Sequence, residues 1–569
     1  MTERRCDVAV LGGGLGGVAG ALAAAEAGAD VLLVAQGPWV GGQLTSQGVC
    51  TPDENAWIEA GGCTRSYQRL RAACRAHYAQ RYRLTEAARE QRHLNIGECW
   101  VSRMAVEPRV AEAILTEQLR HAGVRVLRGA SLAAVVRPNE PITHVTLADG
   151  STVRAAVYLD ATETGEALHL AGIPYRLGAE GRAETGEPSA PDEPQREWIQ
   201  PFTFPFALEL RPAGEVHTIP RPPHYEQHRA TQRYHVVDGA MTGMFGDYGW
   251  WRYRRTISAA CFDDPTFPCD VAMVNTGSND YLGGIYPVSN PRADQQTLQS
   301  GRRASLGYVY WLQTECPRED RPGEFGYPEL RLRSDWFGTR DGLCVEPYIR
   351  ESRRLCALKS VTEGDIVTTR TPGPRAVHQT DSCGIGHYWL DVHAGASPEP
   401  GKFMETHPYQ VPAGALVGRH CPNLIAAAKN LGVTHLTNGA FRLHPVEWAI
   451  GEAAGTLAAL SLQVGALPTA MVAEGSASLL RLQAALVARG APIYWWGDVA
   501  TDSALFEPAQ RLAMRGDWPG GDAIDLQPDA PWTAEAAEGL SACRRQALPK
   551  AALGLTRGEV LLAIAETLT

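Results

Sequence analysis

Several features that mark other classes of protein are missing from this chain of 569 residues. No apolar run approaches the ~18 residues that a membrane-spanning helix needs. Lys and Arg (53) do not outnumber Asp and Glu (63), and the resulting net charge of −10 does not suit a surface that binds nucleic acid. The 13 cysteines form no C-x-x-C pair and have no regular spacing, which indicates reduced thiols. An apolar strand begins soon after Met1 and leaves no room for a signal peptide, so we expect a cytoplasmic protein without membrane or nucleic-acid partners.

The chain does contain a glycine-rich turn between two short apolar stretches. Residues 7–11 are typical of a buried parallel strand, residues 18–29 predict an Ala-rich helix, and residues 30–35 predict a second strand. The turn before the helix matches the pattern G-x-G-x-x-G, in which glycine lets the backbone approach phosphate and the helix N-terminus supplies N–H groups. We therefore predict a Rossmann-like dinucleotide site. The residues predicted to contact the pyrophosphate are Gly12, Gly14, Leu15 and Gly17.

One residue expected of such a site is absent. An acidic side chain normally ends the second strand and accepts hydrogen bonds from the ribose hydroxyls. This chain reads Val34-Ala35-Gln36 instead. Two interpretations stay open: Gln36 binds the ribose as a neutral partner, or other groups hold the ribose.

The segment after the second strand distinguishes between dinucleotides. The run Trp39-Val40-Gly41-Gly42-Gln43-Leu44 resembles the Gly-Gly loop of FAD-dependent oxidoreductases in the glutathione-reductase-like superfamily. Further stretches resemble one family of bacterial FAD-dependent oxidoreductases, and they lie at residues 57–67, 100–109, 160–163, 185–188, 310–315, 347–354 and 430–455. The resemblance implies an FAD cofactor. Because the Gly-Gly loop contains no His to which FAD could be linked, we expect the FAD to be noncovalent. The loop residues predicted to contact it are Gly41, Gly42, Gln43 and Leu44.

We expect an α/β protein of four parts. Residues 1–174 are predicted to form the first part of an interrupted Rossmann-like FAD-binding domain with a small β-meander, and residues 401–465 its C-terminal part. Residues 175–400, rich in Pro and aromatic residues, are predicted to form an α+β substrate or cap domain. Residues 466–569 predict a small helical module, whose Thr-x-x-Glu element resembles a helix-capping signal and a degenerate S-layer-homology repeat. The strands of the meander are predicted at residues 132–136, 144–147 and 152–159.

The C-terminal part of the FAD-binding domain carries the predicted chemistry. A helix begins near His444-Pro445, where proline in the first turn costs no hydrogen bond. In the superfamily that the chain resembles, this helix points its N-terminus at the flavin ring and stabilises negative charge there. The resemblance therefore implies proton transfer or substrate anchoring by His435, Arg442 and His444. Residues predicted to contact FAD in the later segments are Asp160, Asn438, Glu447 and Glu452.

Alternatives to these roles stay open. Arg350 is predicted to clamp a substrate carboxylate beside the flavin, but it could belong to an ion-paired helix face. Asp160 could instead cap a helix, and His435, Arg442 and His444 could each be structural hydrogen-bonding residues. The alternation of His387, Asp391 and His393 does not place all three on one face of a helix or strand, so no metal site is predicted.

We predict an enzyme that transfers a hydride from a small organic substrate to flavin N5, as a dehydrogenase or oxidase, with O2 or another acceptor reoxidising the flavin. A flavin-dependent reductase or monooxygenase is the alternative within this class, although the chain has no convincing second G-x-G-x-x-G for NAD(P)H. An alternative of another class is a flavin-binding module with structural FAD that assembles, for example into a homo-oligomer, through its C-terminal residues.

Overall fold

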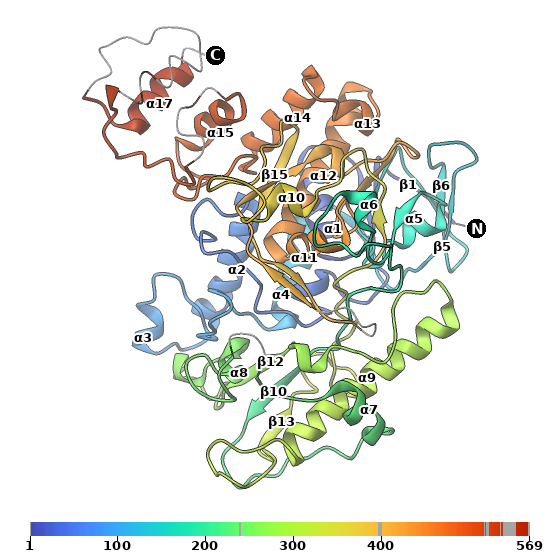
Figure 1. The fold of residues 1–569 in the computed structure, drawn as a ribbon, viewed down its shortest axis with the longest axis vertical. Coiled ribbons are helices and arrows are strands. Elements are labelled where there is room, and N and C mark those ends of the chain that lie inside the picture. Colours follow the sequence, from blue (N-terminus) through green and yellow to red (C-terminus); the bar gives the residue numbers. More distant parts are fainter. Residues whose placement is uncertain are drawn as a thin grey trace.

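The computed structural model describes residues 2–237, 241–395, 401–516, 518, 523–534, 536, 538 and 554–566. The larger lobe, in the upper part of Figure 1, contains a parallel sheet of five strands in the order β19-β8-β2-β3-β4. Every residue of β2 and β3 is buried, as expected of strands covered on both faces. The predicted α/β class is therefore confirmed. The strands are β2 (Val8–Leu11), β3 (Val31–Val34), β4 (Arg125–Leu127), β8 (Val157–Asp160) and β19 (Leu424–Ala426).

A second sheet, in the order β1-β7-β6-β5, forms the meander beside the first. The prediction of one strand over residues 152–159 is wrong, because the structure has two strands there. The first, β7, pairs with β1 and β6, whereas β8 pairs with β2 and β19, and the N–H of Ala156 donates to the Asp7 carbonyl where the chain changes sheets. The meander strands are β1 (Glu3–Arg5), β5 (Leu132–Val136), β6 (His144–Leu147) and β7 (Thr152–Arg154).

Two helices, α1 (Leu15–Glu26) and α12 (His444–Val464), cross at glycines. A Cβ on Gly451 would lie 2.0 Å from the Gly16 carbonyl oxygen, and one on Gly455 would lie 2.1 Å from that of Gly20. The contacts follow the same order along both helices, so the helices run in the same direction. Their N-termini therefore face the same edge of the parallel sheet.

The smaller lobe, at the bottom of Figure 1, is built on an antiparallel sheet in the order β11-β12-β10-β13. Aromatic rings on the long helix α9 and on the chain before β11 stack in its interior: the ring of Tyr308 lies 5.9 Å from that of Trp311 and 5.3 Å from that of Tyr234. The elements of this lobe are β10 (Phe206–Leu210), α7 (Tyr225–Gln232), α8 (Trp250–Tyr253), β11 (Arg255–Ile257), η2 (Ala259–Cys261), β12 (Val271–Val274), η3 (Gly277–Asn279), α9 (Pro291–Thr314) and β13 (Leu330–Leu332).

The remaining elements connect or cover these two lobes. They are η1 (Gly42–Leu44), α2 (Arg65–Arg81), α3 (Glu86–Arg89), α4 (Pro108–His121), α5 (Glu166–Leu170), β9 (Tyr175–Arg176), α6 (Arg182–Thr185), β14 (Arg354–Leu355), α10 (Glu363–Ile366), β15 (Ser382–Gly386), β16 (Leu390–Val392), β17 (Lys402–Met404), β18 (Tyr409–Pro412), η4 (Ala413–Ala415) and α11 (His435–Phe441). The C-terminal helices are α13 (Pro468–Met471), α14 (Ala477–Ala488), α15 (Phe506–Met514) and α17 (Arg557–Glu566).

The last two helices project from the larger lobe at the top of Figure 1. The Thr-x-x-Glu capping signal is confirmed at α17: the Thr556 N–H donates to Glu559 Oε2 at 2.7 Å, and the Glu559 N–H donates to Thr556 Oγ1 at 3.2 Å. Residues 539–553 lie outside the described residues. The S-layer-like repeat and the division of the chain into four parts stay predictions.

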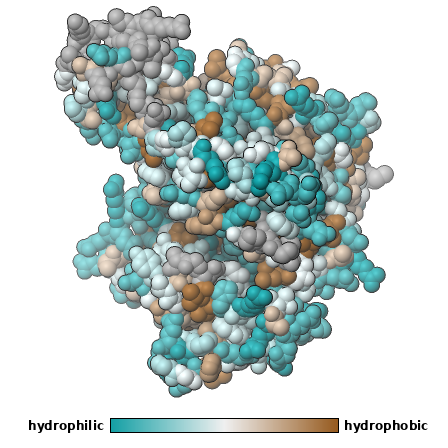
Figure 2. Space-filling model, viewed as in Figure 1, coloured by the Kyte–Doolittle hydropathy of each residue, from teal (hydrophilic) through white to brown (hydrophobic). Residues whose placement is uncertain are grey.

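The face of the molecule in Figure 2 is mainly hydrophilic, with apolar residues in small separate patches. Within the described ranges, no helix combines the length and the hydropathy that crossing a membrane requires.

Candidate functional site

Three segments that are far apart in the sequence meet at the carboxyl edge of β2: the glycine turn, the loop at η1 and the first turn of α12. The Gly41 N–H donates to the Gly13 carbonyl at 2.8 Å. The Gly16 N–H, in the first turn of α1, donates to Glu447 Oε1 at 3.2 Å. Gln43 Nε2 donates to Glu447 Oε2 at 2.5 Å and to the Arg442 carbonyl at 3.1 Å. We call this convergence the glycine edge.

The glycine edge leaves no room for side chains on its own backbone. Gly12 has a φ of +114°, and a Cβ there would lie 2.0 Å from the Ala161 carbonyl oxygen. A Cβ on Gly42 would lie 2.8 Å from the Cα of Gly14, so the two loops touch through bare backbone. The N-terminus of α1 already attracts a carboxylate, that of Glu447, which is the behaviour expected of an anion-binding helix end.

Buried polar atoms surround this backbone without hydrogen-bond partners among the described residues. They are Gln43 Oε1, both amide atoms of Gln47, Asp160 Oδ2, Glu163 Oε1 and Asn430 Oδ1. Isolated buried polar atoms are costly, and they are usually paired in a working protein. A phosphate-binding helix end with amide and carboxylate groups around it fits a dinucleotide, with its phosphates, hydroxyls and ring N–H groups.

Ionisable groups at the glycine edge have shifted pKa values. Burial raises the pKa of Glu447 to about 7, against the opposing charge of Lys429. Burial also raises the pKa of Asp160 to about 6, although Asp160 Oδ1 accepts hydrogen bonds from the N–H and the hydroxyl of Thr162. Lys429 itself lies 2.5 Å from Glu163 Oε2, and that carboxylate helps to keep the amine charged despite its burial.

The other residues predicted to contact the cofactor are distributed between two places. Leu15, Gly17 and Leu44 are buried at the glycine edge, and Gln36 donates from Nε2 to the Glu166 carboxylate at the end of β3. Asn438 lies near Lys429, whose carbonyl accepts from Asn438 Nδ2 at 3.4 Å. Asp160 does not cap α5, whose N-cap residue is Gly165.

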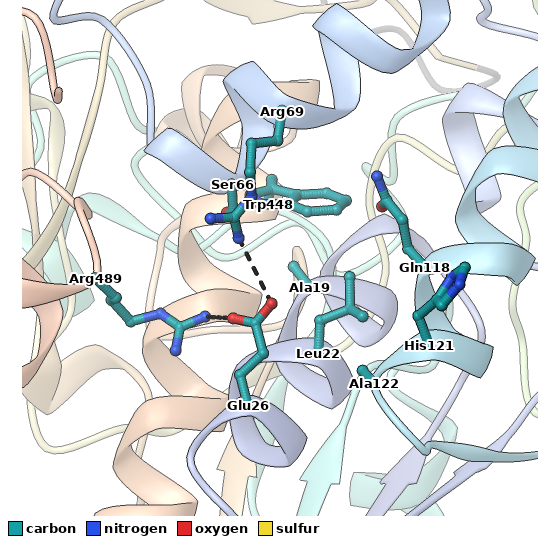
Figure 3. Close-up of a pocket in the computed structure, with 10 residues that line it drawn as sticks. All are labelled: Ala19, Leu22, Glu26, Ser66, Arg69, Gln118, His121, Ala122, Trp448 and Arg489. Carbon is teal, nitrogen blue, oxygen red and sulfur yellow. Dashed lines mark hydrogen bonds and ion pairs between the residues drawn. The ribbon is translucent and has the colours of Figure 1, made fainter.

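Glu452 lies elsewhere on α12, away from the glycine turn. It accepts hydrogen bonds from Ser66 at 2.5 Å and from Arg489 Nε at 2.8 Å. These two partners, Ser66 and Arg489, line a cavity of about 390 Å³ between α1, α2, α4 and α12, whose apolar wall includes Leu22 and Trp448 (Figure 3). The partners of Glu452 therefore favour a helix-packing role.

The predicted histidines are held by other groups. The ring of His444 donates from Nε2 to the Val49 carbonyl at 2.9 Å and accepts at Nδ1 from the Asp53 N–H at 3.2 Å. Burial lowers its pKa to about 4, so this ring is neutral and both nitrogens are engaged. His435 Nδ1 lies 2.8 Å from Glu351 Oε2, in a buried network in which Glu351 also pairs with Arg354. These placements favour positioning roles, and proton transfer by either ring stays a prediction.

The predicted arginines belong to a charge cluster that the sequence reasoning did not assemble. Arg350 lies 2.8 Å from Asp280 Oδ1, and Arg442 lies 3.1 Å from Asp391 Oδ2. His393 joins the two carboxylates, with Nδ1 2.5 Å from Asp280 Oδ2 and Nε2 3.1 Å from Asp391 Oδ2. Asp391 and His393 were considered only as metal ligands at the sequence level. The close spacing of Asp391 and His393 was the sequence signal for this cluster. Asp280 lies more than a hundred residues away, and no sequence pattern connects it to them.

The charge cluster is partly open to solvent. The side chains of His393 and Asp391 are 23% and 24% exposed, whereas those of Arg350 and Arg442 are buried. Burial and Arg350 lower the pKa of His393, but Asp391 and Asp280 outweigh them and raise it. The pKa of Asp391 is lowered because His393 and Arg442 outweigh its burial. Nowhere in the described ranges do three or more His, Cys, Asp or Glu side chains form a group that could hold a metal ion.

A comparison with known protein families agrees with an FAD site at the glycine edge. The sequence pattern of a family described as FAD dependent oxidoreductase matches residues 7–486. No curated protein matches the chain. Among solved structures, the chain is similar to NikD, an unusual amino acid oxidase of nikkomycin biosynthesis, with 17% identity and a TM-score of 0.22 over 38% of this chain and 61% of NikD.

Two further solved structures are similar at the same low level. The Diels-Alderase PyrE3 of pyrroindomycin biosynthesis has 15% identity and a TM-score of 0.25 over 62% of this chain and 57% of PyrE3. The L-proline dehydrogenase from P. horikoshii has 16% identity and a TM-score of 0.16 over 32% of this chain and 25% of that protein. The chain thus spans less than two thirds of each of these proteins, and the assignment depends on the family match. The family match covers most of the sequence and includes the glycine edge. This FAD-binding chain therefore belongs to the FAD dependent oxidoreductase family of enzymes.

Proposed function

We propose that this oxidoreductase oxidises a small organic acid that carries a hydroxyl or amino group, by hydride transfer to noncovalently bound FAD. The charge cluster carries this proposal. Arg350, Arg442 and a protonated His393 exceed the carboxylates of Asp280 and Asp391 by one positive charge. A substrate carboxylate would balance that charge, and arginine binds carboxylates through paired N–H groups.

Both arginines have a free donor for such a substrate. The Nε atoms of Arg350 and Arg442 are buried and have no hydrogen-bond partner within the described part of the chain. Other donors of the two side chains are engaged: Arg350 Nη1 donates to the Pro201 carbonyl at 2.8 Å, and Arg442 Nη1 donates to Tyr348 Oη at 2.9 Å. Both guanidinium groups contact Tyr348: that of Arg442 binds its hydroxyl, and that of Arg350 lies 5.1 Å from the centre of its ring.

FAD and the residues of the charge cluster have separate roles in the proposed oxidation. FAD, when bound at the glycine edge, supplies the N5 atom that accepts the hydride from the substrate carbon. Arg350 and Arg442 hold the substrate carboxylate. The proton that leaves the hydroxyl or amino group passes to water, which reaches the charge cluster at the partly exposed side chains of Asp391 and His393.

Anaerobic spectroscopy of the purified holoenzyme tests the proposal. We expect 2-hydroxy or 2-amino acids to bleach the visible flavin absorption, and the matched alcohols or amines without a carboxylate to leave it unchanged. For the best acid, Arg442→Met is expected to raise the KM about 10- to 100-fold, the range expected for a lost charged hydrogen bond. The exposed Arg292→Met on α9 serves as the control and is expected to keep the wild-type KM.

The other outcomes contradict the proposal in distinct ways. Bleaching by NAD(P)H alone indicates a reductase or monooxygenase. A flavin that resists chemical reductants indicates structural FAD. Equal bleaching by acids and by matched neutral compounds removes the role given to the arginines.

A further inference from the structure

The residue that normally binds the adenosine ribose is missing at the end of β3, where the chain has Gln36. In the sheet order β8-β2-β3 all three strands are parallel, so their carboxyl ends lie along one edge with the glycine turn of β2 in the middle. A residue that follows β8 can therefore reach the same place as one that follows β3, from the other side of the glycine turn.

Glu166 does this. Gln36 Nε2 donates to Glu166 Oε2, a contact between residues 130 positions apart. The Glu166 N–H donates to Thr162 Oγ1 at 2.7 Å, and the Thr162 hydroxyl donates to Asp160 Oδ1 at 2.7 Å. Glu166 is therefore fixed to the end of β8 through its backbone and to the end of β3 through its side chain.

The turn before Glu166 is also fixed. Gly165 has a φ of +59°, and a Cβ there would lie 2.7 Å from the Arg353 carbonyl oxygen. Arg353 NH1 in turn donates to the Thr164 carbonyl at 2.7 Å. The backbone that leads into the first residue of α5 is therefore held in place beside Arg353.

The Glu166 carboxylate keeps one oxygen for a ligand. Gln36 occupies Oε2, and Oε1 makes no hydrogen bond to another described residue. Burial raises the pKa of Glu166, while Gln36 and the charge of Arg353 oppose that rise. The Gln36 carbonyl oxygen beside it is a second acceptor. Two adjacent acceptors suit the two hydroxyls of a ribose.

We propose that Glu166, held by Gln36, binds the vicinal hydroxyls of the adenosine ribose of FAD. In this chain the acidic group of the ribose site therefore lies at the start of α5 and not at the end of β3, and Gln36 orients it. This inference depends on the FAD cofactor and not on the substrate proposed above, so either proposal can fail alone.

A second carboxylate, that of Glu346, lies near the loop at η1 and is compared with Glu166 in the test below. Glu346 Oε2 accepts from the Ser46 hydroxyl at 2.5 Å, and the Glu346 N–H donates to the Ser46 carbonyl at 3.0 Å. Glu346 therefore braces the chain just after η1. Its carboxylate lies beside Gly37, which has no room for a side chain.

Titration of apoprotein with FAD, followed by flavin fluorescence, tests the assignment without any turnover. We expect Glu166→Gln to weaken FAD binding about 10- to 100-fold, as expected for a lost charged hydrogen bond. Gln36→Glu alone is also expected to weaken it, because it places two carboxylates side by side. The exchange Gln36→Glu with Glu166→Gln puts the acid back on β3 and is expected to return the Kd to within about threefold of wild type. Glu346→Gln tests the competing carboxylate, and the exposed Glu86→Gln on α3 is the control with an expected wild-type Kd.

An FAD analogue without the 2′-hydroxyl of the adenosine ribose identifies the contact itself. Wild type is expected to bind this analogue about tenfold more weakly than FAD, and Glu166→Gln is expected to bind both equally. A wild type that binds the analogue as tightly as FAD overturns the proposal. So does a Glu166→Gln variant with a lower melting temperature but an unchanged Kd, or a loss of FAD that follows Glu346 and not Glu166.

Discussion

At the scale of single residues, Glu447 is a carboxylic acid of the glycine edge whose protonation differs between the folded and the unfolded chain. Burial raises its pKa from 4.5 to about 7, although Lys429 opposes the rise. Between these two pKa values the folded state binds more protons than the unfolded state, so the free energy of unfolding falls as the pH rises through this window. The full difference corresponds to about 3 kcal/mol.

We expect Glu447→Gln to remove this dependence. Relative to wild type, the variant should gain up to about 3 kcal/mol in the free energy of unfolding on going from pH 5 to pH 8, because glutamine stays neutral at both. Urea denaturation of the two apoproteins at both pH values measures the gain. The exposed Glu86→Gln on α3 should show no such gain, and an equal pH dependence in Glu447→Gln and wild type would contradict the raised pKa.

Single residues of the site were predictable only where a local pattern carries them. Gly12 and Gly42 follow from short motifs, because a bare backbone is required at fixed positions in a turn. The partner of Gln36 is not encoded near it: Glu166 reaches it only because β8 lies on the other side of β2. In the same way, Asp280 contacts His393 from the smaller lobe, and no spacing in the sequence predicts that contact.

At the scale of elements, the crossing of α1 and α12 fixes the distance between two helix N-termini at the glycine edge. We expect Gly451→Val to lower the free energy of unfolding by about 1–3 kcal/mol, since a Cβ there would lie 2.0 Å from backbone at Gly16 and overpacking has this cost. The same variant should weaken FAD binding, because α1 must move.

Thermal melts and FAD titrations measure both effects. Ala484→Val, at an exposed position of α14, is the control for helix propensity; it should cost less than about 1 kcal/mol and leave FAD binding unchanged. A Gly451→Val variant that melts and binds FAD as wild type does would show that the helices do not meet through these glycines.

The boundaries of elements were harder to predict than their kinds. The helix predicted at residues 18–29 occupies Leu15–Glu26, because Gly14 is extended at its start and Gly28, with a φ of +93°, cannot continue it. The strand predicted over residues 152–159 divides into β7 and β8, because its two halves pair with different sheets. Hydrophobic alternation indicates a strand, but it does not identify the partner of the strand.

At the scale of the whole molecule, the chain beyond the family match is joined to the enzyme body. The match ends at residue 486, but the residues that follow pack into the larger lobe. The ring of Trp495 lies 5.4 Å from that of Trp57, and the Ile493 carbonyl accepts from Ser382 Oγ at 2.6 Å. A Cβ on Gly61 would lie 2.0 Å from the Trp496 carbonyl oxygen, so the two segments touch through backbone.

Trp495→Ala tests whether this junction stabilises the enzyme. The side chain is 1% exposed, and replacing a buried aromatic residue by alanine typically costs about 3–5 kcal/mol through lost burial and the cavity left behind. We expect a loss of that size in the free energy of unfolding, in one cooperative transition that also releases FAD. Trp389→Ala, where the ring is 40% exposed, is the matched control and should cost far less. If Trp495→Ala instead produces a separate early transition while FAD stays bound, the C-terminal segment folds independently of the body and its packing does not support the cofactor.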